Sequence, residues 1–261
     1  MIKFQTLTGM HDLLQDDLEH FNKIEKIAQQ LADFYGFQRI ETPILEGAEL
    51  FEKGTGLLTD IVEKEMYSFR TKGGDYLTLR PEGTPGVARA YIQHGMQSLP
   101  KPVKLWYLGP FFRHERPQAG RLRQFHQLGF ESFGVKSPVV DAVIIQILYH
   151  ILRNLGFRNL IIELNCIGDS QCRSYIKKNL LGYFRSHQSS LCGDCKKRLK
   201  TNPLRILDCK EEKCQRIRRT APQILDHLCK ECHDYFKNLL EFLDELELPY
   251  NLNPYLVRGL D

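Results

Sequence analysis

The chain has 261 residues, of which 42% are hydrophobic and 26% charged, and its formal net charge is +4 at pH 7. These values are ordinary for a soluble globular protein that buries a sizeable core in one or two domains. The longest apolar run, 139–155, is interrupted by charged and polar side chains and is shorter than the ~20 residues that span a bilayer. The N-terminus also lacks the apolar centre of a signal peptide, so we predict a cytoplasmic protein with no membrane partner.

Residues 4–14 are expected to be extended. Apolar residues then recur at helical spacing over residues 18–34, and Gly36 follows as a helix stop. Residues 37–45 predict a strand, whose later part Pro43 confines to an edge or interface position.

A hairpin and a helix start come next in the chain. Tyr67–Arg70 and Tyr76–Arg80 flank a Lys-Gly-Gly-Asp turn, which predicts a hairpin. Thr84 suits the N-cap of a following helix and Pro85 its first position. Glu82 therefore lies at a helix N-terminus, where a carboxylate either complements the helix dipole or holds a substrate ammonium. The dipole role is the commoner of the two.

The stretch 104–134 predicts a second, longer hairpin with a basic tip that contains Gly and Pro. Side chains two residues apart share a face of a strand, so Arg113 and Glu115 are expected to point the same way on the first strand. One face of the second strand carries Phe125, Gln127, Gly129 and Glu131. Burying such charges is costly without partners, which favours a polar ligand; a solvated face with salt bridges fits the pattern equally well.

The rest of the chain changes from a buried helix to a basic, cysteine-rich region. Ser137-Pro138 opens a helix to about residue 154 whose apolar circumference predicts burial, and a strand is expected over 160–167. Residues 192–232 predict a helical insertion, followed by helix over 239–248 and a strand over 251–261.

Basic residues gather in this region. Between Lys177 and Arg219 there are 13 Lys and Arg against 4 Asp and Glu. A basic segment on an acidic body indicates a polyanion partner. A solvated pair of Lys/Arg-rich helices explains the same charge, and charge alone favours that interpretation.

Six of the eight cysteines lie in 192–232, with C-x2-C, C-x4-C and C-x2-C spacing. Two C-x2-C units can hold a structural zinc through Cys192, Cys195, Cys229 and Cys232. Buried or free thiols are the alternative, so zinc stays a possibility and no residue is assigned as a metal ligand. Cys166 and Cys172 are expected to be ordinary core or helix residues.

Three segments carry a family resemblance. FRHERPQAGRLRQFHQLGFE (112–131) resembles motif 2 of class II aminoacyl-tRNA synthetases in its histidine-specific form. RPEGT (80–84) resembles that family's first substrate-binding segment, and LVRGLD (256–261) resembles the start of a motif specific to histidyl-tRNA synthetases. The resemblance implies an α+β fold: a class II synthetase-type antiparallel sheet flanked by helices, with a helical insertion.

The resemblance also implies a division of the chain. Residues 1–170 would be the catalytic core with motifs 1 and 2, residues 171–248 the Cys-rich basic insertion, and residues 249–261 a return strand to the core. Motif 1, the first helix with its Pro-containing strand, would build a homodimer. Motif 3, a tyrosine pair and an anticodon-binding domain have no counterpart here, so the chain is expected to be truncated and weak or inactive alone.

The activity that the resemblance implies is that of a histidine–tRNA ligase. Such an enzyme uses ATP as substrate, with Mg as its counter-ion, to activate L-histidine and transfer it to the acceptor stem of its tRNA. Arg113 and Arg258 would act catalytically by holding the α-phosphate from opposite sides. The remaining implied contacts are Glu115, Arg121 and Phe125 for ATP, Glu82, Gly83, Thr84, Gln127 and Glu131 for histidine, and Arg116, Gln118 and Arg123 for tRNA.

Two other functions remain open. One is a non-catalytic regulatory subunit of histidine biosynthesis built on the same fold, against which the intact RPEGT and RHERPQ segments argue. The other is a zinc-dependent RNA-binding module, which rests on the cysteines and the basic charge alone.

Overall fold

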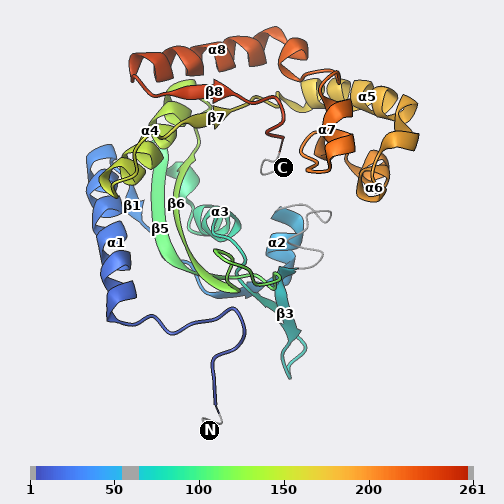
Figure 1. The fold of residues 1–261 in the computed structure, drawn as a ribbon. Helices are drawn as coiled ribbons and strands as arrows, with labels where there is room; N and C mark the ends of the chain where they lie inside the picture. The colour runs from blue at the N-terminus through green and yellow to red at the C-terminus, as the bar shows by residue number, and fades with distance from the viewer. Residues whose placement is uncertain (1–3, 55–64, 258–261) are drawn as a thin grey trace. The chain divides into compact units, whose positions relative to one another are not determined.

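A computed structural model describes residues 4–54 and 65–257 (Figure 1). It divides into two compact units. The first holds the described residues up to Lys136 together with His150–Gly156, and the second holds Ser137–Tyr149 and the described residues from Phe157 onward. The predicted segments 1–170, 171–248 and 249–261 follow motifs instead of compactness, and they stay a prediction.

The first unit opens with the predicted helix, α1 (Gln15–Tyr35). It ends at Gly36, whose φ of 74° lies in the left-handed region that glycine adopts without strain. Its inner face buries Ala28 and Ala32. The predicted stop is therefore confirmed.

The single strand expected over 37–45 is wrong, because the segment forms two strands in different sheets. β1 (Gln38–Arg39) runs parallel to β5, whereas β2 (Leu45–Gly47) pairs antiparallel with β4. Pro43 lies between them and has no amide hydrogen for a ladder bond. A sheet of order β2-β4-β3 results, in which the predicted hairpin of β3 (Tyr67–Arg70) and β4 (Tyr76–Leu79) is confirmed. Helices α2 (Ala48–Gly54) and α3 (Thr84–Gln93) and the short η2 (Met96–Ser98) also belong to this unit.

The other sheet of the unit has the order β1-β5-β6 and contains the predicted long hairpin. β5 (Val103–Phe112) and β6 (Gln124–Phe133) pair antiparallel from Val103 opposite Phe133 to Phe112 opposite Gln124. We call this pair the ribbon; Figure 1 shows its two long strands side by side. Trp106 and Phe111 are buried along it. Arg113 and Glu115 lie beyond the end of β5, so their predicted place on the strand is wrong.

In the second unit, β7 (Ile162–Leu164) pairs parallel with β8 (Tyr250–Leu252). The Cys-rich region is helical as predicted. Its elements are α5 (Ser170–Ser186), η3 (Gln188–Ser190), α6 (Gly193–Thr201), η4 (Pro203–Ile206), α7 (Glu212–Arg218), η5 (Leu225–His227) and α8 (Lys230–Glu245).

Helix α4 (Pro138–Asn154) has the predicted bounds but not the predicted burial. Ala142 packs with Leu239 and Leu243 of α8, while Val139 and Leu148 are exposed. Within 4–54 and 65–257, no helix is both long and apolar enough to cross a membrane.

Candidate functional site

The polar face of the ribbon belongs to both of its strands. Directly opposed residues of an antiparallel pair point to the same side. The register therefore adds four β5 residues to the predicted β6 face, which are Leu105, Tyr107, Gly109 and Phe111, opposite Glu131, Gly129, Gln127 and Phe125 in that order.

The ring of Tyr107 lies against two glycines of the site. A Cβ on Gly129 would come 2.2 Å from Tyr107 Cζ, and one on Gly83 would come 2.1 Å from the same atom. Both positions must therefore lack a side chain while the tyrosine ring is in place. Tyr107 is not among the predicted site residues, although strand alternation places it on the same face as Gly109 and Phe111.

Glu131 connects the ribbon to the N-terminus of α3. Thr84 Oγ1 donates a hydrogen bond of 2.7 Å to Glu131 Oε1. Thr84 is the first residue of α3 and Gly83 is the N-cap, so the predicted capping role of Thr84 is wrong. Burial raises the pKa of the Glu131 carboxyl, and hydrogen bonds from Thr84 and Tyr107 oppose the rise.

Two side-chain oxygens at this site are buried and have no hydrogen-bond partner among the described residues. They are Oε1 of Glu82 and Oε1 of Gln127. Burial raises the pKa of the Glu82 carboxyl, Arg113 lowers it, and Glu131 adds to the rise. Since unpartnered buried acceptors are costly, the two oxygens indicate a ligand that donates hydrogen bonds.

Arg113 directly follows β5, and neighbouring groups fix its side chain. Its Nε donates to the carbonyl of Pro81 at 2.9 Å, and its guanidinium lies over the Phe125 ring, 5.2 Å from the centroid. One terminal nitrogen is 3.9 Å from a carboxylate oxygen of Glu115. The structure thus brings Arg113, Glu115 and Phe125 together, as the resemblance implies for ATP.

The tip of the ribbon carries the other predicted basic residues. Arg121 Nη1 lies 3.1 Å from Glu115 Oε2, and its side chain is 62% exposed. Arg123 donates from Nε to the Glu115 carbonyl at 3.2 Å and from Nη1 to the Thr8 carbonyl at 3.4 Å, so it fixes the tip to the N-terminal segment. Arg116 and Gln118 are exposed. Contact of these tip residues with tRNA stays a prediction.

Arg80 opens the RPEGT segment but has a structural role. It donates to the carbonyls of Pro110 at 2.9 Å and Thr42 at 2.7 Å and lies over the Phe111 ring. A Cβ on Gly109 would come 2.6 Å from its Nη2, so that glycine makes room for the guanidinium. Burial lowers the pKa of Arg80, and the nearby carboxylates of Glu41 and Glu46 offset part of this lowering. Arg80 therefore fixes the segment that directly follows β4 and leads to Glu82.

Arg258, the second predicted catalytic arginine, lies outside the described residues. The cysteines form two groups, and in each the candidate ligand atoms lie within 4.8 Å of one another. One group is Cys192, Cys195, Cys209 and Cys214, and the other is Asp169, Cys172, Cys229 and Cys232. The predicted set that combined the two C-x2-C units is wrong, because each unit has other partners. Cys172 is likewise more than an ordinary helix residue, since it lies in the second group.

The chain is similar to known proteins over most of its length. Residues 9–169 match the family model described as histidyl-tRNA synthetase. The histidine–tRNA ligase of Desulforudis audaxviator is 48% identical over 253 residues, which are 97% of this chain and 60% of that protein. The apo histidyl-tRNA synthetase of S. aureus superposes with a TM-score of 0.77 at 37% identity, covering 100% of this chain and 59% of that one.

A Bacillus halodurans protein described as an ATP phosphoribosyltransferase regulatory subunit/histidyl-tRNA synthetase has a TM-score of 0.67 at 21% identity. The match covers 100% of this chain and 70% of that one. At this identity the likeness shows the fold alone.

The fold is of the class II aminoacyl-tRNA synthetase type, which confirms the predicted α+β class. The family model covers more than half of the chain, so the chain belongs to the histidyl-tRNA synthetase family. It spans about 60% of the length of the curated relatives it matches.

Proposed function

We propose that this chain carries the histidine-activating site of a histidine–tRNA ligase. The observation that supports this most directly is the pair of unpartnered oxygens on Glu82 and Gln127, beside the carboxylate of Glu131. An amino acid with a cationic ammonium and an imidazole N–H supplies the donors that these acceptors lack. The proposal goes beyond family membership, because the chain spans only part of its relatives.

Selection of histidine rests on Gln127 and Glu131 of the ribbon and on Glu82, which precedes α3. Glu82 and Gln127 hold the ammonium. Gly83 and Thr84 lie at the N-terminus of α3, where the backbone atoms of the amino acid bind. Glu131 accepts a hydrogen bond from the imidazole. Thr84 fixes one of its oxygens at 2.7 Å, so the carboxylate is oriented before the ligand arrives. A site built to pair with an N–H rejects analogues that lack one, by factors of about ten thousand.

Activation is an attack of the histidine carboxylate on the α-phosphorus of ATP. The new P–O bond gives histidyl-adenylate, and pyrophosphate leaves with the electron pair of the broken bond. Arg113 neutralises the α-phosphate; its Nε is already bound to Pro81, which holds the guanidinium plane in position. Phe125 stacks on adenine, Glu115 accepts from it, and Arg121 and Arg258 contact phosphates. Mg accompanies ATP as its counter-ion.

The second step transfers the histidyl group to tRNA. The tip of the ribbon contains the exposed Arg116 and Gln118 and the partly exposed Arg123. A basic surface there suits the phosphates of an acceptor stem. The basic insertion is a second surface for that stem, recognised by shape and phosphate instead of by base sequence.

We place the enzyme in the cytoplasm as a homodimer formed by the motif 1 segment. Ile44 and Leu45 are 44% and 42% exposed there, and β2 stands at the end of the described β2-β4-β3 sheet. Apolar side chains on a terminal strand favour association with another chain.

The test is histidine-dependent exchange of pyrophosphate into ATP by the 261-residue chain. We expect slow exchange with L-histidine, and a loss of about 100-fold or more in Arg113→Ala, because one charge that stabilises the transition state is removed. Arg70→Ala is the matched control, since Arg70 contacts the Gly74 carbonyl in the β3–β4 hairpin. Exchange that Arg113→Ala leaves intact would refute the assigned role of Arg113, and no histidine binding by the 261-residue chain would refute the proposed site.

A further inference from the structure

The group of Cys192, Cys195, Cys209 and Cys214 is the strongest chemical feature outside the proposed active site. Cys192 is the N-cap of α6, Cys195 is in its first turn, Cys209 follows η4, and Cys214 lies in α7. Their residues are 9%, 0%, 6% and 0% exposed. Three separate segments thus place four thiols in one buried location.

The spacing of the sulfurs fits one tetrahedral metal. Four thiolates at about 2.3 Å from a zinc ion lie about 3.8 Å from one another. Cys192 Sγ and Cys209 Sγ are 3.9 Å apart, and all four sulfurs lie within 4.8 Å of one another. Two disulfides would bring the sulfurs together only in pairs, whereas here each sulfur is close to the other three.

Backbone amides donate to two of the four sulfurs, and such donors stabilise a thiolate. The amide of Cys195 donates to Cys192 Sγ at 3.4 Å, and the amide of Cys192 donates to Cys214 Sγ at 3.3 Å. Cys192 also caps the N-terminus of the nine-residue helix α6, where the helix dipole stabilises negative charge. Buried anions of this kind need a cation close by, since the surrounding core contains Ile176, Leu180 and Phe184.

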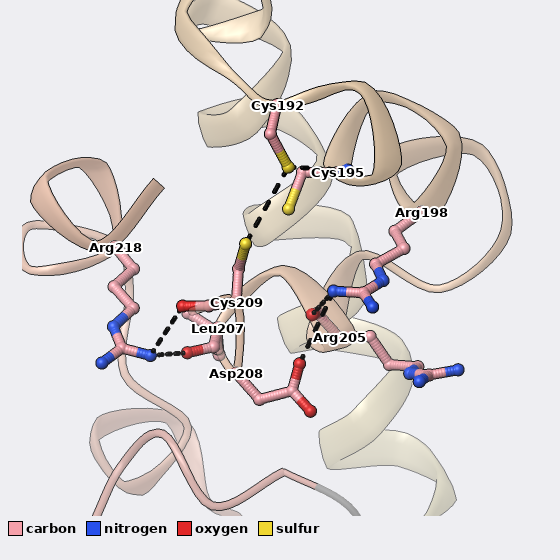
Figure 2. A network of polar contacts seen from close by, with 8 residues as sticks. All are labelled: Cys192, Cys195, Arg198, Arg205, Leu207, Asp208, Cys209 and Arg218. Atoms are coloured by element: carbon pink, nitrogen blue, oxygen red, sulfur yellow. Dashed lines mark hydrogen bonds and ion pairs between the residues drawn. The ribbon is translucent and has the colours of Figure 1, made fainter. Parts of the chain in front are cut away.

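Arginines hold the loop that supplies Cys209 (Figure 2). Arg218 Nη1 donates to the carbonyls of Leu207 at 2.6 Å and Cys209 at 3.5 Å, and Arg198 Nη1 donates to the carbonyl of Arg205 at 3.3 Å. Figure 2 shows the sulfurs of Cys192, Cys195 and Cys209 turned toward one another above this loop. Outer contacts of this type orient the ligands of metal sites. Four thiolates and one zinc carry a net charge of −2, which the basic segment Lys177–Arg219 offsets.

We propose that these four cysteines bind one zinc ion as a closed structural site in the insertion. Binding converts four thiols to thiolates, releases four protons to solvent and forms four Zn–S bonds, with no change of oxidation state. The ion ties the start of α6 to the loop before α7, in a helical region small enough to need such a link. The second group is less suited, because it offers three sulfurs and one carboxylate, and Asp169 and Cys229 are only partly buried.

The test measures zinc in the purified 261-residue chain and in single variants. We expect Cys209→Ser and Cys214→Ser to lower the zinc content by about one ion per chain relative to wild type. Cys229→Ser, from the second group, and Cys166→Ser, from neither group, are expected to keep the wild-type content. Zinc lost in Cys229→Ser and kept in Cys209→Ser would place the metal elsewhere and overturn the proposal.

A second measurement does not depend on how the variants fold. Cobalt titrated into the metal-free wild-type chain is expected to give the visible absorption of a tetrahedral tetrathiolate, and zinc is expected to bleach it. Wild-type protein without bound zinc, whose cobalt complex shows no thiolate charge-transfer band, would overturn the proposal whatever the variants do.

Discussion

The ribbon face and the four-cysteine group both bury polar atoms, but their atoms are satisfied differently. Near the ribbon, Glu82 and Gln127 each keep an acceptor oxygen that accepts no hydrogen bond from the described residues. In the insertion, the sulfurs of Cys192 and Cys214 accept hydrogen bonds from backbone amides, and all four sulfurs lie close enough to share one ion. Buried acceptors without partners indicate a ligand that comes and goes, whereas groups that converge on one point indicate a permanent structural link.

The two regions also differ in what their close contacts achieve. Close packing at the ribbon depends on two positions without side chains, since Gly83 and Gly129 make room for the ring of Tyr107. Close packing in the insertion instead brings four cysteine side chains together within a small apolar core.

The largest effect on stability is expected from Gly129→Ala. The new Cβ would lie 2.2 Å from Tyr107 Cζ, so the ring or the strand must move, at a cost of about 1–3 kcal/mol in the free energy of unfolding. Denaturant unfolding measures this cost. The double variant Gly129→Ala/Tyr107→Ala should be destabilised by less than the sum of its two single variants.

Gly182→Ala is the matched control for this experiment. Gly182 lies in α5, and a Cβ there meets no described atom within 4 Å. The change should leave stability equal or slightly raised, as expected for Gly to Ala in a helix. A Gly129→Ala variant as stable as wild type would contradict the packing of Tyr107 between the two glycines.

A smaller effect, of opposite sign, is expected from Glu82→Gln. Burial raises the pKa of this carboxyl above its ordinary 4.5, so the folded state holds the proton more tightly than the unfolded state. The stability of the wild type therefore falls as pH rises from 4.5 through the raised pKa. The variant has no such titration and should melt at or above the wild-type temperature at pH 7, with the difference disappearing near pH 4.

The same variant should bind histidine about 10- to 100-fold more weakly, because a charged acceptor for the ammonium is lost. Thermal melts across pH and calorimetric titration with histidine measure the two effects. Glu241→Gln, in an exposed pair with Lys237, is the control expected to change neither. A variant that is destabilised at pH 7 yet binds histidine normally would make Glu82 a structural residue.

The predictability of the two regions follows from how each is built. Strand alternation with a period of two placed Phe125, Gln127 and Glu131 on one face, because the ribbon is regular over ten paired positions. Tyr107 follows from the same rule once the register is known, whereas its contact with Gly83 depends on tertiary packing that periodicity does not show. Local periodicity also predicted α1 with its stop at Gly36.

The cysteine partners could not be predicted from spacing. Cys195 and Cys229 belong to similar C-x2-C units that each begin a helix, and the chain path between them decides which residues they meet. The loop after η4 brings Cys209 to the C-x2-C unit of Cys195, whereas the start of α5 brings Asp169 and Cys172 to that of Cys229. The split of the predicted strand over 37–45 has a similar origin, because the two halves join different sheets.

The most direct test of the ribbon site is calorimetric titration of L-histidine into the wild-type chain and into Glu131→Gln. Wild type is expected to bind histidine. The variant keeps an oxygen for Thr84 but loses the negative acceptor for the imidazole, so its affinity should fall at least about tenfold while its melting temperature does not fall. Equal affinities for the two proteins, or no histidine binding by wild type, would contradict the account.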